Sequence, residues 1–80
     1  MRREDILASL NTIFKEVLHR NDIVLNEQMS AKDIAEWDSL SHMIIISNIE
    51  KEWNIHFKIR EIIKMRNVGD MVDTIISQKA

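Results

Sequence analysis

Residues 37–53 read WDSLSHMIIISNIEKEW, a stretch in which a helix start is followed by apolar residues at helical spacing. Asp38 and Ser39 are residue types favoured at helix N-termini, and Asn54 interrupts the pattern after Trp53. At about 100° per residue one face of this helix is shared by His42, Ile45, Ile46, Ile49 and Trp53. The stretch therefore predicts a helix from Asp38 or Ser39 to about Trp53, with this face in the core.

The opposite face of the same helix is also largely apolar. It is formed by Leu40, Met43, Ile44 and Ser47. A small domain has no second core in which to bury these side chains. The sequence therefore predicts an exposed apolar patch directly after Ser39.

The rest of the chain shows similar apolar spacings of three and four, and it contains one glycine and no proline. These features predict a first helix over residues 3–19, a short third helix over 59–64 and a fourth over 68–78 capped by Asn67. The buried stripe of the fourth helix is expected to be Val68, Met71, Val72, Ile75 and Ile76. The predicted fold is all-α, a four-helix bundle with three longer helices and one short one.

A long loop separates the first two helices, because residues 20–36 break the helical period. Turn and capping residue types in it are Asn21, Asp22, Asn26 and Ser30. Its apolar residues, which we expect to pin it to the core, are Ile23, Val24, Leu25 and Met29. We also expect Ser30 to cap a short turn that runs through Ile34.

Length and composition favour one domain over residues 1–80, without disulfides or thiolate metal sites because there is no cysteine. Any thioester sulfur would therefore have to come from outside the sequence. The net charge of -2 arises from 11 basic and 13 acidic residues mixed along the chain, which argues against a nucleic-acid partner. The longest apolar run, residues 43–46, is too short to insert into a membrane, and the N-terminus has no signal-type segment, so a cytoplasmic protein is expected.

Several of these residues carry a family resemblance. Asp38-Ser39-Leu40 at a helix start, in an 80-residue helical chain, resembles the phosphopantetheine site of acyl carrier proteins. Residues 49–55 (IEKEWNI) resemble the end of that family's second helix, and residues 67–70 (NVGD) resemble the entry to its last helix. The resemblance covers nearly the whole chain. It implies the four-helix fold of the acyl-carrier type and a carrier rather than an enzyme.

The resemblance implies that Ser39 holds a covalent 4′-phosphopantetheine arm, placed there from coenzyme A by a phosphopantetheinyl transferase with Mg²⁺. A phosphodiester at a helix N-terminus would meet free N–H groups and the positive end of the helix dipole. The flanking Asp38 would either cap the helix or help position metal and nucleotide in the transferase complex, and Leu40 would contact partners. Acyl-activating or acyl-transferring enzymes are the other implied partners of what we expect to be a monomer.

The sequence also departs from the carriers of fatty acid synthesis. Ser41 and Ile44 stand where acidic residues are expected, whereas the third-helix region is basic through Lys58, Arg60, Lys64 and Arg66. We hypothesise that Met43 and Ile44 help to bind a dedicated partner. Such a partner suggests a specialised pathway, such as polyketide, modified-sugar or surface-polymer biosynthesis.

Other interpretations of the sequence involve its histidines, Trp37 and the type of carrier. A hydrolase built on Ser39 and His42 is rejected, because no oxyanion-hole glycines follow and His42 is expected in the core. His19 and His56 have no metal-ligand spacing and are expected at the surface. Trp37 is expected to pack the loop onto the bundle rather than to bind a partner.

A peptidyl or aryl carrier of nonribosomal synthesis remains an alternative, as does a helical binding module without a prosthetic group.

Overall fold

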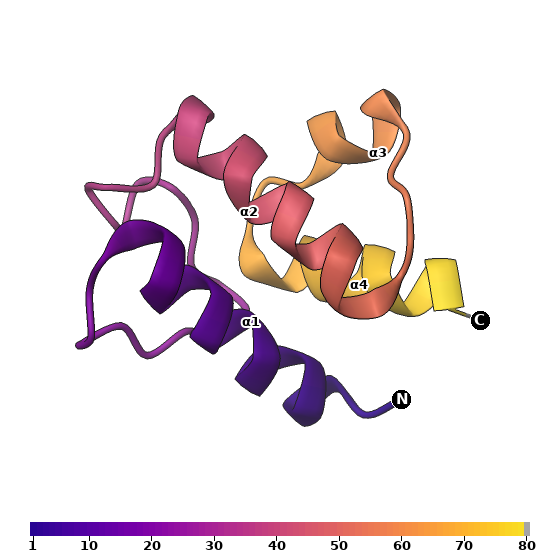
Figure 1. The fold of residues 1–80 in the computed structure, drawn as a ribbon, viewed down its shortest axis with the longest axis horizontal. Helices are drawn as coiled ribbons and strands as arrows, with labels where there is room; N and C mark the ends of the chain where they lie inside the picture. Colours follow the sequence, from indigo (N-terminus) through magenta and orange to yellow (C-terminus); the bar gives the residue numbers. More distant parts are fainter. Residues whose placement is uncertain (80) are drawn as a thin grey trace.

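A computed structural model of the chain describes residues 1–79, which form four helices and no strand. The helices are α1 (Arg3–Leu18), α2 (Ser39–Trp53), α3 (Ile59–Lys64) and α4 (Val68–Lys79). Each lies within one residue of its predicted ends. Figure 1 shows the long helices α1 and α2, the last helix α4, and the short α3 at the edge of the bundle on the side of α2 away from α1. The all-α four-helix prediction is confirmed.

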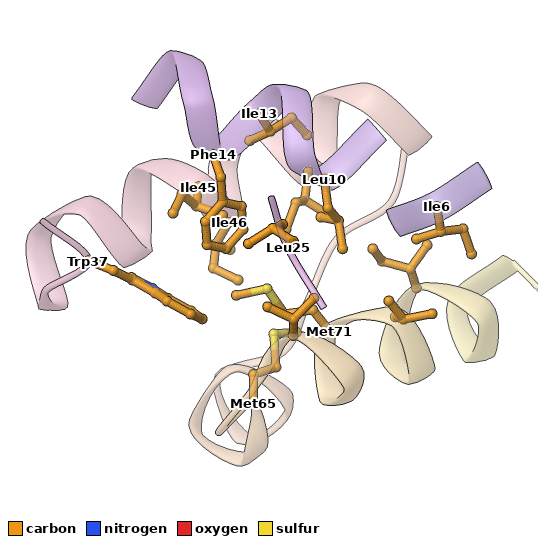
Figure 2. Close-up of a cluster of buried hydrophobic side chains, with 14 of the residues drawn as sticks. Ile6, Leu10, Ile13, Phe14, Leu25, Trp37, Ile45, Ile46, Met65 and Met71 are labelled. Atoms are coloured by element: carbon orange, nitrogen blue, oxygen red, sulfur yellow. The ribbon is translucent and has the colours of Figure 1, made fainter. Parts of the chain in front are cut away.

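One apolar core holds the long helices together (Figure 2). Its large, fully buried side chains are Ile6, Leu10, Phe14, Ile45, Ile49, Val68, Met71, Val72 and Ile75. Those of α2 and α4 belong to the stripes predicted for these helices, and Ile6, Leu10 and Phe14 of α1 follow the same spacing of four residues. Trp53 and Ile76, at the ends of their stripes, are only half-buried. The 3.6-residue period therefore located the core faces correctly and was least accurate near the helix ends.

The loop between α1 and α2 is held by a side chain of α1. Asn11 donates from Nδ2 to the carbonyl of Ile23 at 3.2 Å, and its Oδ1 accepts from the N–H of Leu25 at 2.7 Å. Ile23 and Leu25 are buried on either side of Val24, which is 78% exposed. The prediction that Val24 pins the loop to the core was wrong. Asn11 binds the backbone on either side of Val24 and both neighbours are buried, which leaves the Val24 side chain in solvent.

Farther along the loop, the predicted turn at Ser30 is present. The carbonyl of Ser30 accepts from the N–H of Asp33 at 2.9 Å, and its Oγ accepts from the N–H of Lys32 at 3.3 Å. Ile34, at the end of this turn, is buried in the core. The turn thus brings the chain back to the bundle shortly before α2 begins.

The same loop also supports the start of α4. The N–H groups of Val68 and Gly69 donate to the carbonyls of Met29 and Glu27 at 2.9 and 2.8 Å. Asn67 caps the helix as predicted, because its Oδ1 accepts from the N–H of Asp70 at 2.8 Å. These bonds satisfy N–H groups that have no partner within the helix itself.

Candidate functional site

The first turn of α2 is closed by a reciprocal capping box. Asp38 Oδ1 accepts from the N–H of Ser41 at 2.9 Å, and Ser41 Oγ accepts from the N–H of Asp38 at 2.9 Å. The Ser41 hydroxyl also donates to the carbonyl of Glu36 at 2.9 Å. Hydrogen bonds from Ser41 hold the pKa of the Asp38 carboxyl below its ordinary value. Of the two roles considered for Asp38, the structure shows helix capping.

Ser39 is the first residue of α2 and has an exposed side chain. Within residues 1–79, its hydroxyl has no hydrogen-bond partner in the protein. Because Asp38 and Ser41 cap the helix, Ser39 is not needed for that purpose. Its Oγ is therefore free to be modified without loss of a structural contact, at the helix end where N–H groups and the helix dipole favour an anion.

Trp37, which precedes the capping box, is packed into the core as predicted. Its side chain is buried, and its ring meets Phe14 edge to face with 4.9 Å between ring centroids. The indole Nε1–H donates to Nδ1 of His42 at 3.1 Å, and the two rings are stacked with centroids 6.0 Å apart. The position of Trp37 fixes where the chain enters α2.

The structure corrects the prediction for His42, which is half-buried rather than part of the core. Because Nδ1 accepts the indole proton, a neutral His42 ring carries its own proton on Nε2. Burial lowers the pKa of His42 and favours this neutral form. The only lone pair that could accept a proton from Ser39 is already occupied, so the structure offers no serine–histidine catalytic pair.

A hollow of about 230 Å³ opens directly beside Ser39. It is lined by Ala31, Trp37, Asp38, Ser39, His42, Met65 and Arg66. Neither Ala31 nor Met65 was predicted as a site residue, and Arg66 stood out in the sequence only for its charge. These residues lie 8 or more positions from Ser39 along the chain, so no helical spacing connects them with it. Only the packing of the loop and of the α3–α4 turn against α2 brings them together.

The predicted outward face of α2 is exposed. Leu40, Met43 and Ile44 are 74%, 50% and 47% exposed, and Ser47 is exposed as well. No charged residue occurs from 39 to 49. On α3, which has no fully buried residue, Ile59 and Ile63 are exposed. The surface after Ser39 is therefore apolar, as the sequence predicted.

His19 and His56 are exposed, as predicted. Residues 1–79 contain no group of three side chains suited to hold a metal ion. None of their helices is long and apolar enough to cross a bilayer.

Comparison with known proteins places this geometry in a family. No protein-family model matches the chain. Curated acyl carrier proteins from two strains of Tropheryma whipplei, Twist and TW08/27, are each 30% identical to it over 80 residues. The match covers 100% of this chain and 98% of each relative. The chain belongs to the acyl carrier protein family.

Solved acyl carrier proteins share its fold. The solution structure of the holo acyl carrier protein from Geobacter metallireducens is 41% identical, with a TM-score of 0.85 over 91% of this chain and 84% of that one. The acyl carrier protein of Thermotoga maritima, at 24% identity, has a TM-score of 0.87 over 99% and 92% of the two chains and supports the fold alone. Acyl carrier proteins are carriers rather than enzymes.

Proposed function

We propose that Ser39 is the attachment site of a 4′-phosphopantetheine arm, on which this acyl carrier protein holds its cargo. The observation that carries the proposal is the free hydroxyl of Ser39 beside a cap made by its neighbours. The arm would supply the thiol for a thioester, which a chain without cysteine lacks. The holo form of the Geobacter relative supports the assignment.

In the attachment step, Ser39 Oγ loses its proton and attacks the phosphorus of coenzyme A that bears the pantetheine. The new Oγ–P bond forms as the pyrophosphate P–O bond breaks, and 3′,5′-ADP leaves. His42 is not placed to take this proton, because its Nδ1 already accepts from Trp37. The transferase would then supply the base.

Mass spectrometry tests the attachment site. The purified protein is incubated with coenzyme A, Mg²⁺ and a promiscuous phosphopantetheinyl transferase. Wild type should gain one arm, and Ser39→Ala should gain none. Ser77→Ala removes an exposed hydroxyl of α4 and should still gain one. The assignment fails if wild type stays unmodified or if Ser39→Ala is modified equally.

We further propose that the carrier binds a dedicated protein partner through the outer face of α2, formed by Leu40, Met43, Ile44 and Ser47. The first three are exposed apolar side chains, and a contiguous apolar patch in water is typical of an interaction site. The charge distribution indicates what kind of surface the partner has. Residues 58–66 contain four basic residues and one acidic residue, whereas the rest of the chain has seven basic and twelve acidic residues. Among the described ion pairs, none includes Lys58, Arg60 or Lys64.

A partner surface that is apolar and bordered by carboxylates would complement the apolar outer face of α2 and the basic residues 58–66. Such a partner surface differs from the basic patches that acidic carriers meet. It favours a specialised biosynthetic pathway over general fatty acid synthesis. The cargo on the arm would then be chosen by that partner enzyme and not by the carrier.

A charge placed on the outer face of α2 tests this partner surface. Ile44→Glu should lower kcat/KM for arm or acyl transfer about tenfold, because an apolar contact is replaced by a carboxylate that must lose water on binding. Val24→Glu is the matched control, since it adds the same charge at an exposed apolar residue of the loop. Mass spectrometry of the products measures the transfer rates of both variants. Unchanged transfer rates for Ile44→Glu would refute the surface.

A further inference from the structure

The hydroxyl of Ser41 joins α2 to the segment of chain that enters it. Ser41 is half-buried, and its Oγ accepts from the N–H of Asp38 at 2.9 Å. The same hydroxyl donates to the carbonyl of Glu36 at 2.9 Å, and the carbonyl oxygen of Asp38 lies farther from it, at 3.2 Å. One side chain of the helix therefore binds the main chain on both sides of Trp37, directly before Ser39.

The contact between Ser41 and Glu36 is not needed to cap the helix. The first turn of α2 is already capped by Asp38, whose Oδ1 accepts from the N–H of Ser41. Glu36 lies outside the helix, before the capping residue. A bond to its carbonyl satisfies none of the N–H groups that the helix leaves open. It fixes instead the direction in which the chain enters α2.

A second contact ties the entering segment to α2, but it acts through a side chain. The indole of Trp37 donates to Nδ1 of His42 at 3.1 Å, whereas Ser41 binds the main chain of the segment directly. The side chain of Ser39 has no hydrogen-bond partner within residues 1–79. Its hydroxyl is therefore placed by the main chain, and the Ser41 hydroxyl holds that main chain.

We propose that Ser41 is a positioning residue for the attachment reaction, because it holds the start of α2 in the geometry that presents Ser39 Oγ to the phosphorus of coenzyme A. This inference rests on the proposed attachment at Ser39. Reacting atoms must meet within a narrow range of distances and angles. Without the Ser41 hydroxyl the chain before Ser39 would take several directions, and only a fraction of the bound carriers would present the serine correctly.

Steady-state kinetics of arm attachment test this role. The assay uses coenzyme A, Mg²⁺ and a promiscuous phosphopantetheinyl transferase, and mass spectrometry measures the product. Ser41→Ala should lower kcat about tenfold, as a misplaced nucleophile predicts, and should change KM for the carrier by less than about twofold, because the outer face of α2 is intact. Ser41→Thr keeps a hydroxyl at this position and should recover most of the wild-type kcat.

Asn67→Ala is the matched control for a lost helix cap. Asn67 Oδ1 accepts from the N–H of Asp70 at the start of α4, so the variant removes a side-chain cap from another helix. Asn67 does not line the hollow beside Ser39. Both alanine variants should have a lower Tm than wild type, and only Ser41→Ala should have a lower kcat. The rates are measured well below each Tm, so that every variant is folded.

The outcomes separate this inference from the proposed function. If wild type gains no arm, the attachment fails and the inference fails with it. If wild type gains the arm and Ser41→Ala keeps the wild-type kcat, the attachment stands and the positioning role is refuted. Equal losses of kcat in Ser41→Ala and Asn67→Ala would also refute it, since stability alone would explain them. A Ser41→Thr variant no faster than Ser41→Ala would show that the hydroxyl does not set the rate.

Discussion

Asp38, Ser39 and Ser41 all lie at the first turn of α2, but only Asp38 and Ser41 stabilise that turn. Their reciprocal hydrogen bonds satisfy backbone groups that the helix leaves open. Ser39 is thereby relieved of a structural role and keeps an exposed hydroxyl. At the residue scale, the proposed attachment site is defined by what its neighbours do as much as by the serine itself.

His42 should make the stability of the carrier depend on pH. Burial lowers its pKa from the ordinary value of 6.5, so the unfolded chain takes up a proton at a higher pH than the folded chain. The free energy of unfolding should therefore fall as pH falls below about 6.5, until the pKa of the folded state is passed. Above this window the effect should be absent.

Thermal unfolding at pH values of about 7.5 and 5.5 measures this effect. His42→Asn should lose a larger part of the wild-type decrease than His19→Asn, the same change at an exposed histidine. Asn suits the left-handed backbone of position 19, where φ is 55°. Equal pH dependence in wild type and both variants would contradict the burial argument. Asp38 and Arg66, which share the hollow with His42, are present in all three proteins.

At the scale of elements, α4 begins against the α1–α2 loop and not free in solvent. The N–H of Gly69 donates to the carbonyl of Glu27 at 2.8 Å, and the neighbouring N–H of Val68 donates to Met29. The absence of a side chain at Gly69 lets the loop approach this closely, since an added Cβ would lie 3.0 Å from the Glu27 carbonyl oxygen. The contact holds the loop that leads to Ser39.

Gly69→Ala should therefore destabilise the protein although alanine is the better helix former. The added methyl group would push the Glu27 carbonyl away and weaken its hydrogen bond. We expect a net loss of about 1 kcal/mol, which corresponds to a Tm lower by roughly 5 °C for a domain of this size. Ser77→Ala, at an exposed position of α4, is the control for helix propensity. A raised Tm for Gly69→Ala would show that the loop adjusts without cost.

For the whole molecule, one arginine connects segments that are far apart in the sequence. Arg3 of α1 binds Glu27 of the loop through two nitrogens and Asp73 of α4 at 2.7 Å. This network joins the first helix, the loop and the last helix on one side of the core. It also explains why the pKa of the Glu27 carboxyl is lowered, with the hydrogen bond from Arg3 as the main cause.

Arg3→Gln should lower the free energy of unfolding only modestly, because the network is partly exposed to solvent. Added salt should reduce the difference between wild type and variant, since ions screen exposed charges. Arg2→Gln is the neighbouring control, because within residues 1–79 its one ion pair is with the exposed Glu4. Urea unfolding at low and high salt measures both variants. A salt-independent difference would point to lost packing instead of lost ion pairs.

The sequence by itself determined the helices, their buried faces, the position of Ser39 at a helix start and the apolar outer face of α2. These features follow from local rules, namely the 3.6-residue period and the capping preferences of a few residue types. The same rules were wrong about the burial of two side chains, which depends on their neighbours in the folded chain. Val24 lies in an apolar run yet is exposed, and His42 lies on the core stripe yet is half-buried.

Only the tertiary structure decided the surroundings of Ser39. Ala31, Met65 and Arg66 reach the hollow from the loop and the α3–α4 turn, and Trp37 fixes the ring of His42. Periodicity relates residues within one helix, but it does not say which distant loop residue will pack against it. Those contacts depend on how the loop is tied to α1 and α4 and on the filling of a shared core, which are properties of the folded chain as a whole.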